Sequence, residues 1–121
     1  SSPARLLETR LGQPGCYTPG VPLTAGQTYT QQARGICSGV TVPIDALGVV
    51  GNATVVSPSA AGYLTFWPSN ASQPFVATSN YRSSTVFNRH FTVALGADGA
   101  FKRFASTTTD LVIDLSGYFA P

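Results

Sequence analysis

The stretch DLVIDLSGYF, residues 110–119, decides the fold class of this chain. Leu111, Ile113 and Leu115 alternate with residues that are partly polar, and this two-residue period indicates a β-strand with one apolar face. The same alternation recurs along the 121 residues, with turn residues between one such segment and the next. The sequence therefore predicts an all-β fold, and its length suits a single domain over residues 1–121 with its own core.

The recurring segments predict eight or nine strands of an antiparallel β-sandwich, either a jelly roll or an immunoglobulin-like fold. A long irregular segment with three prolines, residues 11–25, follows the first strand, and residues 42–46 are the one candidate for a helical turn. The expected strands are residues 4–10, 27–33, 47–56, 63–67, 75–81, 85–95, 100–105 and 111–119.

Two short connections predict which strands are neighbours. The turn-forming residues 57–62 join two of the expected strands, so we expect those strands to lie side by side as an antiparallel pair. Residues 96–99, Gly-Ala-Asp-Gly, are a hairpin signal because an Asp-Gly pair readily supplies positive φ angles. We expect the strands on either side of this turn to form a hairpin.

The only two cysteines, Cys16 and Cys37, lie in loop-like sequence rich in glycine, proline and threonine. An even number of cysteines in such positions predicts a disulfide, and a bridge closing a loop of this length contributes about 3 kcal/mol to stability. Two free thiols are the alternative. We expect no metal centre, because two cysteines without a nearby histidine fall short of four tetrahedral ligands.

The chain carries little charge. Its net charge is +2 and 10% of its residues are charged, against about 25% in an average soluble protein. The basic residues form no stripe of the kind that nucleic-acid-binding proteins present, so we expect no nucleic-acid partner. No apolar run approaches the roughly 20 residues of a membrane-spanning helix, and we expect no membrane insertion. With the predicted disulfide, this low-charge composition predicts a secreted, extracellular protein.

Residues that could carry a reaction are sparse. His90 is the single histidine, and the sequence has no G-x-S-x-G elbow for a nucleophilic serine. Asp110 and Asp114 share strand parity, as two glycosidase carboxylates would, but simpler roles are open to both. We therefore expect no enzyme activity and no cofactor. For Asp114 the simpler role is an ion pair with one of three arginines: Arg5, Arg10 or Arg103.

Four motifs, taken in order, resemble those of a poorly characterised family of bacterial secreted or surface β-domains. Residues 3–10, PARLLETR, are similar to the PxRLLDTR opening of that family, and residues 60–68, AAGYLTFWP, resemble xAGYLTVWP. Residues 79–81, SNY, resemble a shortened SNLNY, and residues 110–119 resemble DLIVDVxGYF. Glu8 stands where the family has aspartate. The resemblance covers nearly the whole chain and implies a secreted, non-catalytic β-domain.

Tyr63 and Trp67 share one face of an expected strand. Exposed aromatic rings can stack on the apolar face of a sugar, so one interpretation is a carbohydrate-binding module whose contacts are Tyr63, Trp67 and Tyr81. The other interpretation is that Trp67 fills the core or closes the end of a sheet. Asn70, in the sequence Asn-Ala-Ser, fits the glycosylation acceptor pattern.

The first ten residues are a candidate intermolecular strand. Arg5, Leu6 and Leu7 could pair with the open sheet edge of another copy, because such an edge has unpaired N–H and C=O groups. Head-to-tail contacts of this kind generate filaments. The alternative is that this strand pairs within its own domain. We therefore expect a non-catalytic structural or adhesive module of a bacterial surface or filamentous assembly, which contacts copies of itself, another extracellular protein or a polysaccharide.

Overall fold

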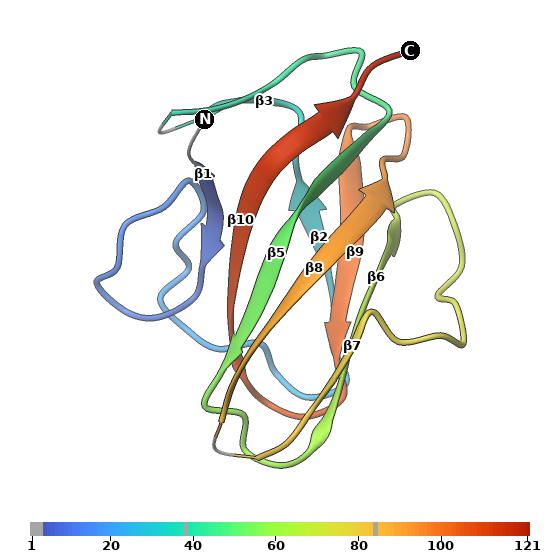
Figure 1. Ribbon diagram of the computed structural model, residues 1–121. Coiled ribbons are helices and arrows are strands. Elements are labelled where there is room, and N and C mark those ends of the chain that lie inside the picture. The colour runs from blue at the N-terminus through green and yellow to red at the C-terminus, as the bar shows by residue number, and fades with distance from the viewer. Residues whose placement is uncertain (1–3, 38, 84) are drawn as a thin grey trace.

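The computed structural model describes residues 4–37, 39–83 and 85–121, and within them the chain is all-β. Two four-stranded sheets lie face to face, and a small separate hairpin lies at the upper end of the molecule (Figure 1). The front sheet has the order β1-β10-β5-β8, the rear sheet has the order β2-β9-β6-β7, and the hairpin is β3-β4. The strands are β1 (Ala4–Glu8), β2 (Thr28–Gln32), β3 (Gly35–Cys37), β4 (Val40–Val42), β5 (Gly48–Val56), β6 (Gly62–Pro68), β7 (Ser79–Tyr81), β8 (Val86–Ala94), β9 (Ala100–Ala105) and β10 (Asp110–Phe119).

The strand order is that of a jelly roll. β1 pairs with β10, β2 with β9, β5 with β8 and β6 with β7, and every one of these pairs is antiparallel. β10 also pairs with β5, and β9 with β6, which completes the two sheets. The chain is thus a long hairpin rolled up so that its first and last strands meet. The predicted β-sandwich is confirmed, and of the two expected topologies the strand order is that of the jelly roll.

Both predicted neighbour relations are wrong, because consecutive strands of this fold mostly lie in opposite sheets. β5 lies in the front sheet between β10 and β8, whereas β6 lies in the rear sheet between β9 and β7. The turn at residues 96–99 does form, with the Gly96 N–H donating to the Ala100 carbonyl at 2.9 Å and Gly99 at φ +78°. It carries the chain from β8 in the front sheet to β9 in the rear sheet, so these two strands do not pair.

Other differences from the sequence expectation are local. The short strands β3 and β4 were not expected at all. The predicted strand at residues 75–81 forms only at Ser79–Tyr81; residues 75–78 lie in the preceding loop, where Phe75 and Val76 are exposed instead of packing on the sheet. Residues 42–46 contain a turn rather than a helix, closed by the Ala46 N–H and the Pro43 carbonyl at 3.1 Å.

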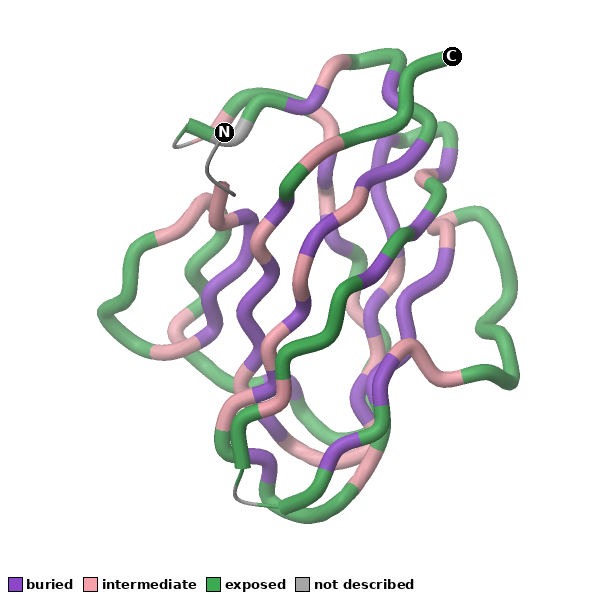
Figure 2. The backbone as a smooth tube through the Cα atoms, in the orientation of Figure 1, coloured by how far each residue is buried: buried purple, intermediate pink, exposed green. Residues whose placement is uncertain are grey.

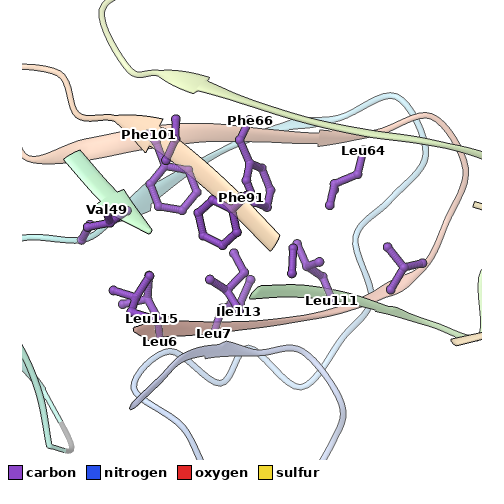
Figure 3. Close-up of a cluster of buried hydrophobic side chains, with 14 of the residues drawn as sticks. Leu6, Leu7, Val49, Leu64, Phe66, Phe91, Phe101, Leu111, Ile113 and Leu115 are labelled. Carbon is purple, nitrogen blue, oxygen red and sulfur yellow. The ribbon is translucent and has the colours of Figure 1, made fainter. Parts of the chain in front are cut away.

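The core lies between the two sheets (Figure 3). Phe66 and Phe101 from the rear sheet meet Phe91 from the front sheet, with ring centroids of Phe66 at 4.9 Å from Phe91 and 5.3 Å from Phe101. Figure 2 shows buried and less buried residues alternating along β5, which is the period that defines a strand with one apolar face. In β10 the predicted inward set is buried as expected: Leu111, Ile113 and Leu115.

The first strand lies in its own sheet. β1 pairs with β10 of the same chain, and Leu6 and Leu7, the leucines considered for strand exchange, are buried in the core of this chain. The register shifts between Arg5 and Leu7, so β1 has one residue more than its partner at this point. Such a shift allows two adjacent leucines to be buried where strict alternation would expose one of them.

The predicted disulfide is confirmed. Cys16 and Cys37 are bonded, with their Cα atoms 5.4 Å apart. The bond links the long irregular segment after β1 to the end of β3. The small hairpin is thereby attached to the segment beside β1, the edge strand of the front sheet.

Candidate functional site

An apolar groove of about 570 Å³ lies at the upper end of the sandwich, beside the β3–β4 hairpin. Ile36 and Ile44 line it and are 82% and 88% exposed. Leu47 and Phe119 are also half-exposed, and the Leu47 N–H donates to the Phe119 carbonyl at 2.8 Å. These four residues, Ile36, Ile44, Leu47 and Phe119, are here called the end patch. Exposed apolar groups gathered in this way are typical of an interaction surface.

Arg34 holds the chain beneath the end patch. Its guanidinium donates to the Ala46 carbonyl from Nε at 3.0 Å and from Nη2 at 2.7 Å, and Nη1 donates to the Ala97 carbonyl at 3.0 Å. One side chain therefore links the turn that carries Ile44 to the turn at residues 96–99. All three contacts go to backbone carbonyls, so Arg34, although it lines the groove, is engaged in holding these two turns in place.

Asp98 lies at the rim of the same groove and also has a structural role. Its Oδ1 accepts from the Ser69 hydroxyl at 2.5 Å and from the Ala100 N–H at 3.1 Å. The Ser69 hydrogen bond is the main cause that lowers the pKa of the Asp98 carboxyl. The groove thus has fixed polar groups at its rim and apolar side chains inside.

The predicted sugar platform is wrong for two of its three residues. Trp67 and Tyr81 are only 5% and 4% exposed, so neither ring offers a face to a ligand. Tyr81 belongs to the core, and its hydroxyl lies 2.9 Å from Thr107 Oγ1. Trp67 points away from the core, because Leu64 and Phe66 occupy the inner face of β6. It is buried on the outer face of the rear sheet.

Tyr63, the third residue of that platform, lines a second groove of about 590 Å³ on the outer face of the rear sheet. The loop between β6 and β7, which projects at the right of Figure 1, forms the other wall. We call this the Tyr63 groove, and its lining residues are Tyr63, Gln73, Pro74, Phe75, Ala77 and Asn80.

The RLLETR opening builds an ion-pair cluster. Glu8 is fully buried, and its Oε1 accepts from Arg10 Nη2 at 2.8 Å and from Arg5 Nη1 at 3.3 Å. Arg5 also donates from Nε to Asp114 Oδ1 at 3.0 Å, so of the three arginines expected for Asp114 it is Arg5 that pairs. Burial raises the pKa of Glu8, but hydrogen bonds and charge from Arg10, with the charge of Arg5, outweigh it and lower that pKa. The two arginines and the two carboxylates of this cluster balance each other in charge.

Sequence reasoning missed a buried arginine. Arg103 is 7% exposed and follows the parity of Phe101 in β9, so it lies on the inner face of the rear sheet. Its Nε donates to Gln31 Oε1 at 3.2 Å, its guanidinium lies 4.7 Å from the ring centre of Tyr29, and Nη1 has no hydrogen-bond partner within the described residues. Burial lowers the pKa of Arg103 to about 10. The signal that could have placed it inside is its strand parity, which it shares with the buried residues Phe101 and Ala105.

The remaining expected site residues lie apart from both grooves. Asn70 is exposed in the turn after β6, and His90 is exposed on β8 opposite Asn52. Throughout residues 4–37, 39–83 and 85–121, no three histidine, cysteine or acidic side chains gather as metal ligands would. The same residues include no helix with the length and apolar character needed to cross a membrane.

The chain was compared with known proteins. No family model matches it, and no curated protein matches it.

Proposed function

We propose that this chain is a non-catalytic structural or adhesive module of an extracellular assembly, and that it contacts protein partners through the end patch. The observation that supports this proposal is the pair Ile36 and Ile44, which are almost fully exposed beside an apolar groove. Full burial of an isoleucine side chain contributes about 1.5–3 kcal/mol. Two of them on one surface provide a strong driving force for association.

The disulfide and the hydrogen bonds of Arg34 hold the end patch in place, which favours binding without rearrangement. The disulfide fastens Cys37, next to Ile36, and Arg34 fixes the turn that carries Ile44. A contact surface that is already ordered loses little conformational entropy on binding, so more of the burial energy appears as affinity.

The proposed partner is a second copy of this chain or another extracellular protein. The open edge of the front sheet offers a second kind of contact, because β8 pairs on one side only, with β5. Arg89 is exposed in the middle of β8, however, and two such edges would bring two arginines together. The uncharged end patch is therefore the better contact between identical copies.

The disulfide supports a proposal about the compartment in which the chain works. A disulfide such as Cys16–Cys37 is typical of an oxidising, extracytoplasmic environment. We propose secretion or display on a bacterial surface, which is also what the resemblance to bacterial secreted β-domains implies.

Sedimentation velocity over a range of protein concentrations tests this proposal. We expect the unmodified chain to associate as concentration rises and Ile44→Ser to remain monomeric. Val86→Ser is the matched control, because Val86 is also an exposed branched residue but lies at the start of β8, at the lower end of the molecule (Figure 1). A monomeric unmodified chain at every concentration, or equal losses from both substitutions, contradicts self-association through the end patch.

A further inference from the structure

We propose that the Tyr63 groove is a binding site for a neutral saccharide. This site lies on a different surface from the end patch and is built largely from residues that the sequence did not single out. Its lining combines two exposed aromatic rings with two side-chain amides. That combination matches the alternation of apolar ring faces and hydroxyl groups along a saccharide.

The pairing of β6 with β7 places the first wall of the groove. Tyr63 and Asn80 are register partners across these antiparallel strands, so their side chains emerge next to each other on the outer face. Both are exposed. An aromatic ring and an amide thus lie side by side on a sheet rather than on a flexible segment.

Two aromatic rings are available for stacking. The Tyr63 ring packs against Phe104 of β9, with the ring centroids 5.8 Å apart, so it is supported on one side by the sheet. Phe75 lies on the loop that forms the other wall, and its exposure of 108% means that it contributes no burial to the fold. Exposing the apolar ring of a phenylalanine to water is unfavourable in free energy, and stacking the apolar face of a sugar on the ring removes that surface from water.

The polar groups indicate a ligand without charge. The side-chain amides of Gln73 and Asn80 both line the groove, and each can both donate and accept hydrogen bonds. Neighbouring hydroxyls of a sugar need donors and acceptors of this kind. Among the residues that the structure describes, no acidic side chain, lysine, arginine or histidine lines the groove, so its lining favours an uncharged ligand.

The loop wall is anchored at both of its ends. The Ala71 N–H donates to the Pro68 carbonyl at 3.0 Å just after β6. Thr78 fixes the other end: its N–H donates to the Leu64 carbonyl at 2.8 Å, and its Oγ1 accepts from the Phe66 N–H at 2.9 Å. These bonds hold residues 73–77 beside the sheet, so a saccharide would meet a groove that already exists.

The test is a titration of the isotope-labelled full chain followed by NMR. The probes are three neutral hexasaccharides (cellohexaose, chitohexaose and mannohexaose) and one anionic probe, hexagalacturonate. We expect at least one neutral probe to shift the backbone amide signals of Tyr63 and of residues 73–80, and hexagalacturonate to leave them unchanged. The proposal is overturned if none of the neutral probes shifts these signals, or if the shifts lie at the end patch.

Matched substitutions on one loop sharpen the test. Phe75→Ala is expected to weaken binding of the responding hexasaccharide by about tenfold, because it removes one stacking surface. Val76→Ala changes a neighbouring residue that is 76% exposed but does not line the groove, and binding should stay within about twofold. Equal weakening of saccharide binding by the two substitutions would contradict a binding site in the Tyr63 groove. Ile44→Ser should leave saccharide binding intact, so a failure of this proposal and a failure of the end patch are distinguishable.

Discussion

Glu8 shows how one residue can fix the edge of the front sheet. Its buried carboxylate accepts hydrogen bonds from Arg5 and Arg10, and Arg5 reaches on to Asp114 in β10. The first strand is therefore attached to the last by charge as well as by backbone hydrogen bonds. Both arginines are partly exposed, which limits the cost of burying the cluster.

Replacing this carboxylate tests its contribution to stability. Glu8→Gln keeps the side-chain size but leaves Arg10 without its ion-pair partner and Arg5 with Asp114 alone, and we expect the free energy of unfolding to fall by about 1.5–3 kcal/mol. Urea unfolding measures the change. Asp45→Asn is the control, because Asp45 is exposed and takes part in none of the ion pairs within the described residues. Equal effects of the two substitutions would contradict a special role for Glu8.

The stability should also depend on pH through Glu8. Its pKa is lowered in the folded chain from the ordinary value of 4.5, so the unfolded chain binds a proton more readily. The stabilisation is complete above that ordinary value and is lost as pH falls through the lower, folded-state value. We expect the midpoint of thermal unfolding to fall as the solution is acidified below about pH 5. Glu8→Gln should flatten this dependence, and an unchanged profile would refute the linkage.

Some of these residue roles could be predicted and others could not. Strand parity placed Asp114 where an arginine could reach it, and Arg5 was among the three candidates. Burial of Trp67 was one of the two interpretations, but its burial on the outer face of the strand could not be predicted, because a period of two indicates exposure there. What covers an outer face depends on segments that are distant in sequence or on loops, and alternation carries no information about them.

At the scale of elements, the contact between β5 and β10 depends on one glycine. Gly51 lies opposite Leu115, where β10 shifts its register by one residue before Gly117. A Cβ atom at Gly51 would overlap the backbone carbonyl of Asp114 and lie 3.0 Å from the Cα of Leu115. Only glycine allows the two strands to approach this closely at the shift.

We therefore expect Gly51→Ala to destabilise the fold by about 1–3 kcal/mol, since strand backbone cannot move aside as a side chain can. Gly117→Ala is the comparison, because its added Cβ would meet only a methyl group of Val50, at 3.3 Å. Thermal unfolding of the two variants gives the measurement. A smaller loss for Gly51→Ala than for Gly117→Ala would show that the bulge can adapt.

The elements themselves were largely predictable, whereas their partners were not. Alternation located β5, β8, β9 and β10 to within about two residues, because each has a long face on the core. The turn at residues 96–99 was recognised from its Gly and Asp residues, but turn chemistry does not specify which sheet receives the next strand. In a jelly roll that choice is made by pairing between the two halves of the chain. Short strands such as β3 have too few residues to show a period.

At the scale of the whole molecule, the disulfide joins the fold to its proposed contact surface. Cys16 and Cys37 connect the loop after β1 to the hairpin that carries Ile36. Replacing both cysteines with serine should lower the free energy of unfolding by about 3 kcal/mol. It should also weaken self-association, because the β3–β4 hairpin would no longer be tied to the loop after β1. Unfolding and sedimentation of the double variant measure the two effects. If the double variant self-associates as strongly as the unmodified chain, the end patch does not depend on the disulfide.

The measurement that tests the central claim most directly is a series of ¹⁵N–¹H correlation spectra recorded over a range of protein concentrations. The end patch accounts for association if the amide signals that move with concentration belong to Ile36, Ile44, Leu47 and their neighbours. Spectra that do not change with concentration, or changes centred on Tyr63 and Phe75, would contradict it.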